Sequence, residues 1–388
     1  MRSSLTWRSL IYVFLGIAIV EGSSALVCRL LSTFSQTSRF IWNPDFEQAR
    51  SNWNAHASLA DQEIGGFAAS GAKQNSEFPG NAQSCGSAYG DSFVSGWEVA
   101  DGDGWVERLS HALGCRVTNY AVGGYGTDQA YLRFQKISDD SAMVLLGIDS
   151  NSIMDVVSQY DGFLGSEPEP YLLKGRFLLD SYQHLQWAPQ PHLDANGFVA
   201  LHRNPAQVLP HSYFLPDTPD GPVTFRFPYA VTLARVALMP SLHDILARRA
   251  EWSGLYGAHH PSGALQLMVS ISEAFVDLAN ARGKRPLIVV LPVAASFRQQ
   301  ANHGEFEYAP LVAALRAKHI DVFDPGAAMI AALGGHTACE LFTHQHAETS
   351  FAWLASPLPC GGHYSSFGHE ILARLVYAEL RSRNFIRQ

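Results

Sequence analysis

The chain has 388 residues, of which 47% are hydrophobic and 16% are charged. This balance is typical of a globular protein and excludes a disordered one, and the length permits one large domain or two. The net charge of −8 at pH 7, with lysine and arginine scattered singly, argues against a nucleic-acid partner, because phosphate binding needs a concentrated basic face.

The first 30 residues form a separate segment. Arg2 and Arg8 precede an apolar run over residues 10–20. Basic residues before an apolar segment place its amino end in the cytoplasm and export the chain that follows. The body is therefore expected outside the cytoplasm, in the periplasm of a bacterial cell.

Two interpretations of this segment stay open. Small residues at Ser23 and Ala25 allow cleavage as a signal peptide, which would release a secreted body. Apolar character resumes over residues 26–28, which favours an uncleaved signal anchor in the inner membrane. Glu21 is a defect in such an anchor and is tolerable near an interface. A buried helix of a soluble protein is the third alternative.

Residues 31–80 are rich in Ser, Asn, Ala and Gly, which predicts an extended arm laid over the domain. From residue 81 to residue 388, strand and helix patterns alternate. Strands are expected at 85–90, 116–122, 142–148, 286–291 and 320–324, and helices at 104–113, 127–134 and 263–281, through 311–315 and after residue 363. Five parallel strands with intervening helices predict a three-layer α/β/α sandwich with the flavodoxin-like strand order 2-1-3-4-5.

The alternation stops between about residues 152 and 260. This insertion is rich in proline and aromatic residues, and in its later part only residues 240–249 indicate a helix. It leaves the sheet next to Asn151, at the edge where α/β folds place their sites, so we expect a lid that shapes the substrate site. Its aromatic side chains suit sugar contacts or packing.

Four short blocks carry the chemical signal. They are Gly90-Asp91-Ser92, Gly124, Asn151 in Gly147-Ile-Asp-Ser-Asn151, and His363 in Gly362-His363-Tyr-Ser-Ser-Phe-Gly368. In this order they resemble the blocks of the SGNH (GDSL) esterase and acyltransferase superfamily. A lone Gly-Asp-Ser recurs by chance, whereas four ordered blocks are far more specific.

The resemblance implies a role for each block. Ser92 would be the nucleophile and His363 its general base. The oxyanion hole would combine the backbone N–H groups of Ser92 and Gly124 with the side-chain amide of Asn151. Each residue also has a plainer interpretation: a helix cap for Ser92 and Asn151, a turn glycine for Gly124, and a surface histidine among sixteen for His363.

The chain departs from the family at the catalytic acid. Many members place an aspartate two or three residues before the histidine, and here those positions hold Gly361 and Cys360. The sequence therefore leaves a serine–histidine dyad, or an acid supplied from elsewhere in the chain.

The five cysteines fit an exported body. Cys85 and Cys115 begin strands that are expected to be neighbours, so a bridge between them is geometrically possible. A bridge between Cys339 and Cys360 would close a loop of about twenty residues. Cys28 is left over. The alternative is that all five are reduced and buried.

No cofactor and no metal are expected. The pairs His259-His260 and His344-Gln-His346 lack cysteine or carboxylate partners at ligand spacing. The segment Gly123-Gly-Tyr-Gly126 does not match a dinucleotide fingerprint.

These observations predict an exported, membrane-anchored serine esterase or acyltransferase. Its expected substrate is an ester, often acetyl, on a glycan, processed through an acyl-serine; the substrate class follows from the family resemblance and the predicted location. The alternatives are a catalytically weak or inactive glycan-binding or scaffold protein of the same fold, and a lipase, which the mixed polar and aromatic composition of the insertion disfavours.

Overall fold

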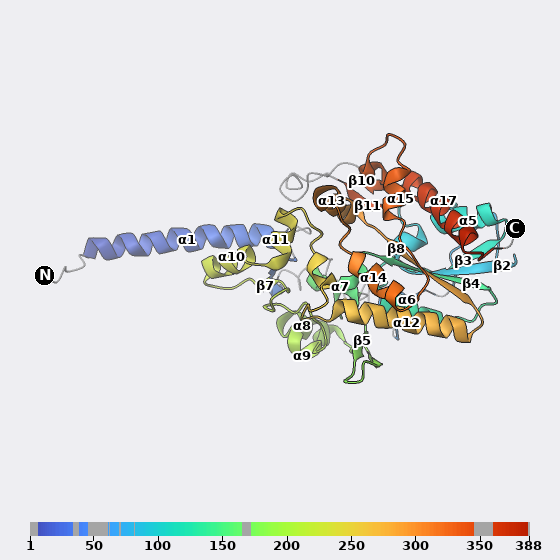
Figure 1. The fold of residues 1–388 in the computed structure, drawn as a ribbon. Coiled ribbons are helices and arrows are strands. Elements are labelled where there is room, and N and C mark those ends of the chain that lie inside the picture. Colours follow the sequence, from blue (N-terminus) through green and yellow to red (C-terminus); the bar gives the residue numbers. More distant parts are fainter. Residues whose placement is uncertain are drawn as a thin grey trace.

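The computed structural model describes residues 7–33, 39–45, 61, 63–69, 71–80, 82–164, 172–344 and 360–386. A five-stranded parallel sheet lies at its centre (Figure 1). Its strands are β2 (Ser84–Tyr89), β3 (Arg116–Asn119), β4 (Met143–Asp149), β8 (Arg285–Leu291) and β9 (Val322–Phe323), in the order β3-β2-β4-β8-β9. Counted along the chain this is 2-1-3-4-5, so the predicted flavodoxin-like order is confirmed.

Helices cover both faces of the sheet. On one face α5 (Trp105–Leu113) packs against α17 (Ser366–Ser382), and on the other α12 (Ala264–Ala281) packs against α6 (Thr127–Lys136) and α14 (Ala309–Ala317) (Figure 1). Strand β4 is buried along its whole length, as a central parallel strand covered on both faces must be. Helices α13 (Ala294–His303) and α15 (Gly326–Ala331) complete the body. The three-layer sandwich is confirmed.

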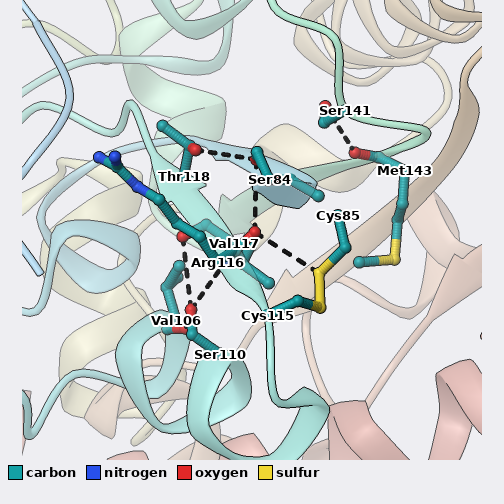
Figure 2. Close-up of a disulfide and its surroundings, with 11 residues drawn as sticks. Ser84, Cys85, Val106, Ser110, Cys115, Arg116, Val117, Thr118, Ser141 and Met143 are labelled. Carbon is teal, nitrogen blue, oxygen red and sulfur yellow. Dashed lines mark hydrogen bonds between the residues drawn. A yellow bond between two sulfur atoms is a disulfide. The ribbon is translucent and has the colours of Figure 1, made fainter. Parts of the chain in front are cut away.

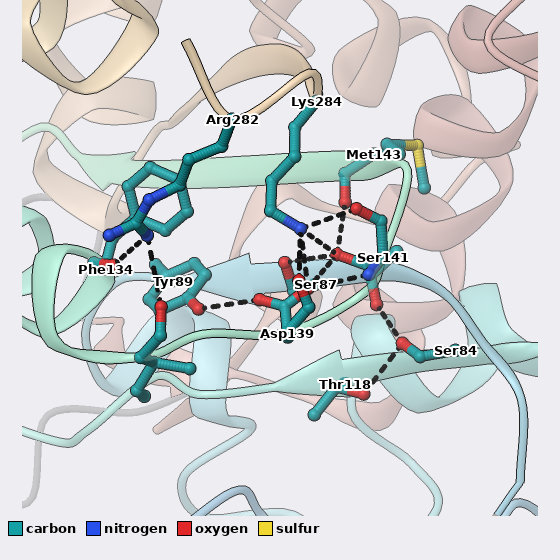
Figure 3. A network of polar contacts seen from close by, with 12 residues as sticks. Ser84, Ser87, Tyr89, Thr118, Phe134, Asp139, Ser141, Met143, Arg282 and Lys284 are labelled. Atoms are coloured by element: carbon teal, nitrogen blue, oxygen red, sulfur yellow. Dashed lines mark hydrogen bonds and ion pairs between the residues drawn. The ribbon is translucent and has the colours of Figure 1, made fainter. Parts of the chain in front are cut away.

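A disulfide and a buried ion pair hold the amino ends of the strands. Cys85 and Cys115 are bonded, as expected, and link the starts of β2 and β3 (Figure 2). The ammonium of Lys284, in the turn before β8, lies 2.9 Å from the carboxylate of Asp139 and 2.6 Å from the carbonyl of Ser141, in the turn before β4 (Figure 3). These contacts fasten the amino ends of four of the five strands, at the edge of the sheet opposite to the carboxyl ends.

The insertion contains more helices than the sequence indicated. Its elements are α7 (Ser152–Asp155), η2 (Asp161–Leu164), β5 (Arg176–Leu179), β6 (Leu185–Ala188), α8 (Ala195–Arg203), α9 (Pro205–Val208), β7 (Val223–Thr224), α10 (Tyr229–Ala237), α11 (Pro240–Leu246) and η4 (Ser253–Tyr256). The prediction that 240–249 is the one helix of its later part is wrong, because α10 precedes it. Seven of the nine residues of α10 are apolar, and the two polar ones, Thr232 and Arg235, lie three apart on one side, so little in its composition marks a solvent-exposed helix.

The insertion is fused to the body through buried polar contacts. The hydroxyl of Tyr256 donates to the carbonyl of Ser150, at 2.6 Å. The ammonium of Lys174 lies 2.6 Å from the carboxylate of Asp128, and both side chains are buried. A buried charge without its partner would cost several kcal/mol, so this pair ties the insertion firmly to α6.

The amino-terminal helix α1 (Trp7–Thr33) projects from the body (Figure 1). It is long and apolar enough to cross a membrane, which fits a signal anchor and a signal peptide alike. After it, β1 (Ile41–Trp42) pairs in parallel with β7 of the insertion. Residues 46–60 of the expected arm lie outside the described part of the chain.

Candidate active site

Ser92 stands in a tight turn at the carboxyl end of β2, as the first residue of the short helix α4 (Ser92–Ser95). Gly90 has φ 153° at this turn, and a Cβ on it would lie 2.4 Å from a methyl of Val94, so no other residue fits. The carboxylate of Asp91 accepts hydrogen bonds from the N–H groups of Phe93 (2.8 Å) and Val94 (3.3 Å). The Gly-Asp-Ser sequence thus fixes the backbone that carries Ser92.

His363 meets Ser92 from the other end of the chain. It lies in β11 (Gly361–Tyr364), which pairs with β10 (Phe342–His344), and not in a loop as expected. Its Nε2 is 2.8 Å from the hydroxyl of Ser92, although 271 residues separate the two. The ring of Phe93 packs beside the imidazole, with centroids 5.0 Å apart. The structure therefore brings the predicted serine and histidine into hydrogen-bond contact.

The residue behind His363 is Glu98. Its Oε2 lies 3.2 Å from the ring Nδ1 of His363, an ion-pair contact in which the ring N–H is not aligned for a standard hydrogen bond. The same oxygen accepts the backbone N–H of His363 at 3.2 Å and a hydrogen bond from the hydroxyl of Thr343. Apo sites often show such loose geometry before substrate tightens it. A carboxylate thus occupies the position of a third triad member.

The positions two and three residues before His363, where many family members carry the catalytic acid, hold no carboxylate here. Cys360 is bonded to Cys339, which confirms the second expected disulfide, and Cys28 is a buried free thiol. Gly362 has φ 75°, and a Cβ on it would lie 2.3 Å from the hydroxyl of Thr343 and 3.0 Å from the carboxylate of Glu98. Glycine at this position lets the carboxylate reach the histidine.

Backbone strain and charge both mark Glu98. Its φ is 68°, an uncommon value for a residue other than glycine, and strain of this kind concentrates at functional sites. Burial raises the pKa of the carboxyl, but the hydrogen bonds from Thr343 and His363 outweigh it, so the pKa lies below its ordinary value. Glu98 is therefore a carboxylate at neutral pH.

One weak signal in the sequence points to Glu98. It lies in the loop directly after α4, which Gly96 ends in a left-handed conformation at φ 72°. A loop that leaves the nucleophile's own helix at the carboxyl edge of the sheet is a natural place for the acid. A carboxylate six residues after the serine was the available clue.

Two backbone N–H groups are available as oxyanion donors. In the part of the chain that the structure describes, neither Ser92 nor Gly124 donates its N–H to an acceptor. Gly124 has φ 78°, and a Cβ on its neighbour Gly123 would lie 3.8 Å from that of Ser92, so this turn lies against the serine. Free N–H groups beside a nucleophile are what a tetrahedral oxyanion requires.

Asn151 begins α7, at the same edge of the sheet. It follows β4, which pairs with β2, so the carboxyl ends of the two strands meet. The Asn151 side chain makes no capping hydrogen bond to α7. Its function as an oxyanion donor stays a prediction.

Two buried carboxyls lie beneath the nucleophile turn. Burial raises the pKa of Asp149 well above its ordinary value, and the charge of Asp91 raises it further. Burial also raises the pKa of Asp91, to about 6, while a hydrogen bond from Asp149 lowers it. Asp149 also accepts the backbone N–H and the hydroxyl of Ser152, so the two carboxyls link the turn that carries Ser92 to the start of α7.

An exposed indole lies at the mouth of the site. Trp97 is 57% exposed, and its ring is 3.4 Å from the Cβ position of Gly123. Its backbone N–H donates to the carbonyl of Ser92 at 3.1 Å. A flat apolar surface is thus fixed beside the nucleophile.

Within the described residues, no group of three or more His, Cys, Asp or Glu side chains could hold a metal. His259, His260 and His344 belong to this part of the chain, whereas His346 lies outside it.

The comparisons with known proteins give a likeness of fold only. No family model matches the chain, and no curated protein matches it. Among solved structures, a protein assigned to the lipolytic G-D-S-L family from Desulfitobacterium hafniense DCB-2 is 11% identical, with 75% of this chain and 97% of that chain covered and a TM-score of 0.33. A protein assigned as an acylhydrolase from Bacteroides fragilis NCTC 9343 is 13% identical, with 76% and 86% covered and a TM-score of 0.31.

Similarity at this level carries no argument about the reaction. The case for the chemistry rests on the four blocks and on the geometry of the residues in them. The site resembles that of the SGNH hydrolases.

Proposed function

We propose that this protein is a serine esterase or acyltransferase of the SGNH type. The observation that carries the proposal is the relay from the Ser92 hydroxyl to Nε2 of His363, at 2.8 Å, and from Nδ1 of His363 to Glu98, at 3.2 Å. A serine hydroxyl is a weak nucleophile until a positioned base removes its proton, and a carboxylate behind the base stabilises the imidazolium that forms.

The reaction follows from these positions. The Ser92 oxygen attacks the ester carbonyl while His363 Nε2 takes its proton, and the N–H groups of Ser92 and Gly124 bind the oxyanion, with Asn151 as a third donor. His363 then returns the proton to the leaving alcohol, and an acyl-Ser92 remains. Water, or a second hydroxyl, attacks this acyl group with His363 again as base. Water gives an esterase and a sugar hydroxyl gives a transferase.

The substrate that we propose is an acyl ester, chiefly acetyl, on a glycan outside the cytoplasm. Two disulfides and an amino-terminal apolar helix support an exported body held at the membrane. Trp97 offers the flat face that sugar rings use for stacking, and it lies next to the nucleophile.

The catalytically inactive alternative loses its main support. It rested on the absence of an acid before His363, and Glu98 supplies a carboxylate at that histidine. The lipase alternative differs in the acyl chain that the site accepts, so the assay below separates it.

The test uses the full-length protein in detergent, because α1 packs against the body. Wild type, Ser92→Ala and His363→Ala are treated with a fluorophosphonate probe and assayed with p-nitrophenyl esters of increasing chain length and with an O-acetylated oligosaccharide. Ser95→Ala is the matched control, since Ser95 lies in the same helix α4. We expect labelling and turnover of acetyl esters in wild type and control, and neither in the other two variants.

The outcomes separate the candidates. Preference for long acyl chains over acetyl would support the lipase instead. A folded wild type that neither labels nor turns over any ester would sink the enzymatic proposal and favour glycan binding. An acetyl adduct on Ser92, trapped by rapid acid quench and located by mass spectrometry, would support the acyl-enzyme.

A further inference from the structure

The carboxyl-terminal half of α1 is packed against α10 of the insertion (Figure 1). The carboxylate of Glu21 accepts the backbone N–H of Tyr229, at 2.6 Å, and that of Ala230, at 3.4 Å. Cys28 is fully buried, and its thiol contacts the carbonyl of Tyr229 at 3.9 Å. The acid that looks like a defect in the apolar segment is therefore the acceptor for the first turn of α10, whose N–H groups have no partners within the helix.

The charges of α1 fix how deep this contact must lie if the helix spans a membrane. Arg8 and Arg29 bound the part of α1 that contains no basic residue, and the twenty residues between them match the ~30 Å of a hydrocarbon core at ~1.5 Å per residue. Glu21 lies eight residues inside Arg29, a depth of roughly 12 Å. Tyr229, whose backbone N–H donates a hydrogen bond to Glu21, must lie at the same depth.

The outer surface of α10 fits this position. Its exposed residues are Val231, Ala234 and Ala237, followed directly by Leu238, and they carry no charge or polar group. Val231 is 53% exposed and Leu238 is 73% exposed, and Phe227 in the turn before the helix is 69% exposed. Helix α1 also carries exposed apolar residues in this region, among them Leu26 and Val27. In water such a face would be a liability.

The polar groups of α10 are satisfied on its other side. The hydroxyl of Thr232 donates to the carbonyl of Arg226 at 2.9 Å. The guanidinium of Arg235 lies 2.6 Å from the carboxylate of Asp217, and that of Arg226 lies 3.4 Å from the same carboxylate. Long arginine side chains can extend to the headgroup region while their stems stay in apolar surroundings.

We propose that α10, with the Phe227–Pro228 turn, is a second membrane element, which lies in the leaflet nearest the body, packed on α1, with its exposed face against lipid acyl chains. The inference rests on α1 as a span and not on the catalytic activity. It has two consequences. The first is that α1 is kept in the mature protein. The second is that the body is held in one orientation at the membrane, because two membrane elements prevent the rotation about the membrane normal that a single helix would allow.

The experiment uses the full-length chain with Cys28→Ser, because the other four cysteines are paired in disulfides. An environment-sensitive fluorophore is attached to single cysteines introduced by Val231→Cys or Leu238→Cys. The matched control is Tyr182→Cys, since Tyr182 is 78% exposed in the turn between β5 and β6. The proteins are reconstituted in phosphatidylethanolamine and phosphatidylglycerol vesicles, with iodide on both sides as the aqueous quencher and nitroxide-labelled lipid as the membrane quencher.

We expect iodide quenching at positions 231 and 238 to be several-fold weaker than at 182, and nitroxide lipid to quench only the first two. Iodide quenching equal to that of the control would overturn the proposal. Protection from iodide without quenching by lipid would also overturn it, because the face would then be covered by protein.

A second measurement tests whether α1 is retained. The intact mass of the protein extracted from membranes should include residues 7–25. Cleavage after Ala25 would remove Glu21 and contradict the proposal. Adding Ser92→Ala to the labelled Val231→Cys and Leu238→Cys proteins should leave their quenching unchanged, so the result is independent of the proposed chemistry.

Discussion

A single oxygen of Glu98 lies 3.2 Å from the ring Nδ1 of His363 and 3.2 Å from the backbone N–H of the same residue. The carboxylate therefore positions both the imidazole and the strand that carries it. Thr343, on the neighbouring strand β10, donates to the same oxygen. A site assembled in this way needs no aspartate immediately before the histidine.

The first prediction concerns this carboxylate. Glu98→Gln keeps the size of the side chain but removes the charge that stabilises the imidazolium, so kcat should fall on the order of 10²- to 10⁴-fold with the fold unchanged. Steady-state kinetics with a small acetyl ester measure this, and circular dichroism checks the fold. Glu77→Gln is the control, since Glu77 is exposed and contacts His111 on the surface. Wild-type kcat in Glu98→Gln would show that the dyad acts alone.

The sequence predicted the sheet and half of the site for identifiable reasons. The continuous apolar run of β4 and the amphipathic pattern of α12 are local signals, and strand alternation limits the topology to few choices. Ser92 and His363 could be found because they stand in short, glycine-containing motifs that resemble the blocks of a known family in their order along the chain. Glu98 could not, because its function depends on a tertiary approach that Gly362 permits.

The helix α10 was missed for a related reason. Seven of its nine residues are apolar, and the two polar ones, Thr232 and Arg235, bond to the insertion, so the usual pattern of a surface helix with a polar solvent face is inverted. Its position depends on packing against α1, which is about 200 residues away in the chain. Glu21 was seen as a defect for the same reason, because its hydrogen-bond donors come from α10.

The second prediction concerns Trp97 and rests on the proposed glycan substrate. Trp97→Ala removes the exposed aromatic face beside Gly123, so KM for an O-acetylated oligosaccharide should rise roughly tenfold, which corresponds to about 1.4 kcal/mol of lost binding. Turnover of p-nitrophenyl acetate, which has no sugar, should stay near wild type. Trp97→Phe should restore part of the loss, and Tyr182→Ala serves as an exposed aromatic control. Equal effects on both substrates would count against a sugar platform.

The third prediction separates the two disulfides. The Cys85–Cys115 bond closes a loop of 30 residues at the end of the sheet away from Ser92, and replacing both cysteines by serine should remove about 3–4 kcal/mol of stability while activity at 25 °C is kept. The Cys339–Cys360 bond spans 21 residues and ends three residues before His363. Its double serine variant should lose activity as well, because β11 is no longer fixed. Thermal unfolding measures the stability of both variants and esterase assays measure their activity. Equal activity in the two variants would contradict the prediction that only the Cys339–Cys360 bond is needed for activity.

The fourth prediction concerns His369, a fully buried histidine of α17. Its Nδ1 accepts the backbone N–H of Trp105 at 3.2 Å, so the ring is held neutral. Burial, together with the nearby positive charges of Lys73 and Arg108, lowers the pKa of His369 to about 3. An unfolded chain takes up this proton below pH ~6.5, whereas the native protein takes it up only near pH 3.

The contribution of neutral His369 to stability is therefore complete above pH ~6.5 and is lost as the pH falls towards 3. Between pH 7 and pH 5 the free energy of unfolding should fall by up to ~2 kcal/mol from this group. His369→Gln, whose amide oxygen can accept the same N–H, should remove that part of the slope. Urea unfolding at the two pH values measures it, with the exposed His111→Gln as control. Asp91, whose pKa is raised by burial to about 6, acts in the opposite direction over this range and does not produce this slope. An unchanged slope in His369→Gln would therefore contradict the assignment of the acid sensitivity to His369.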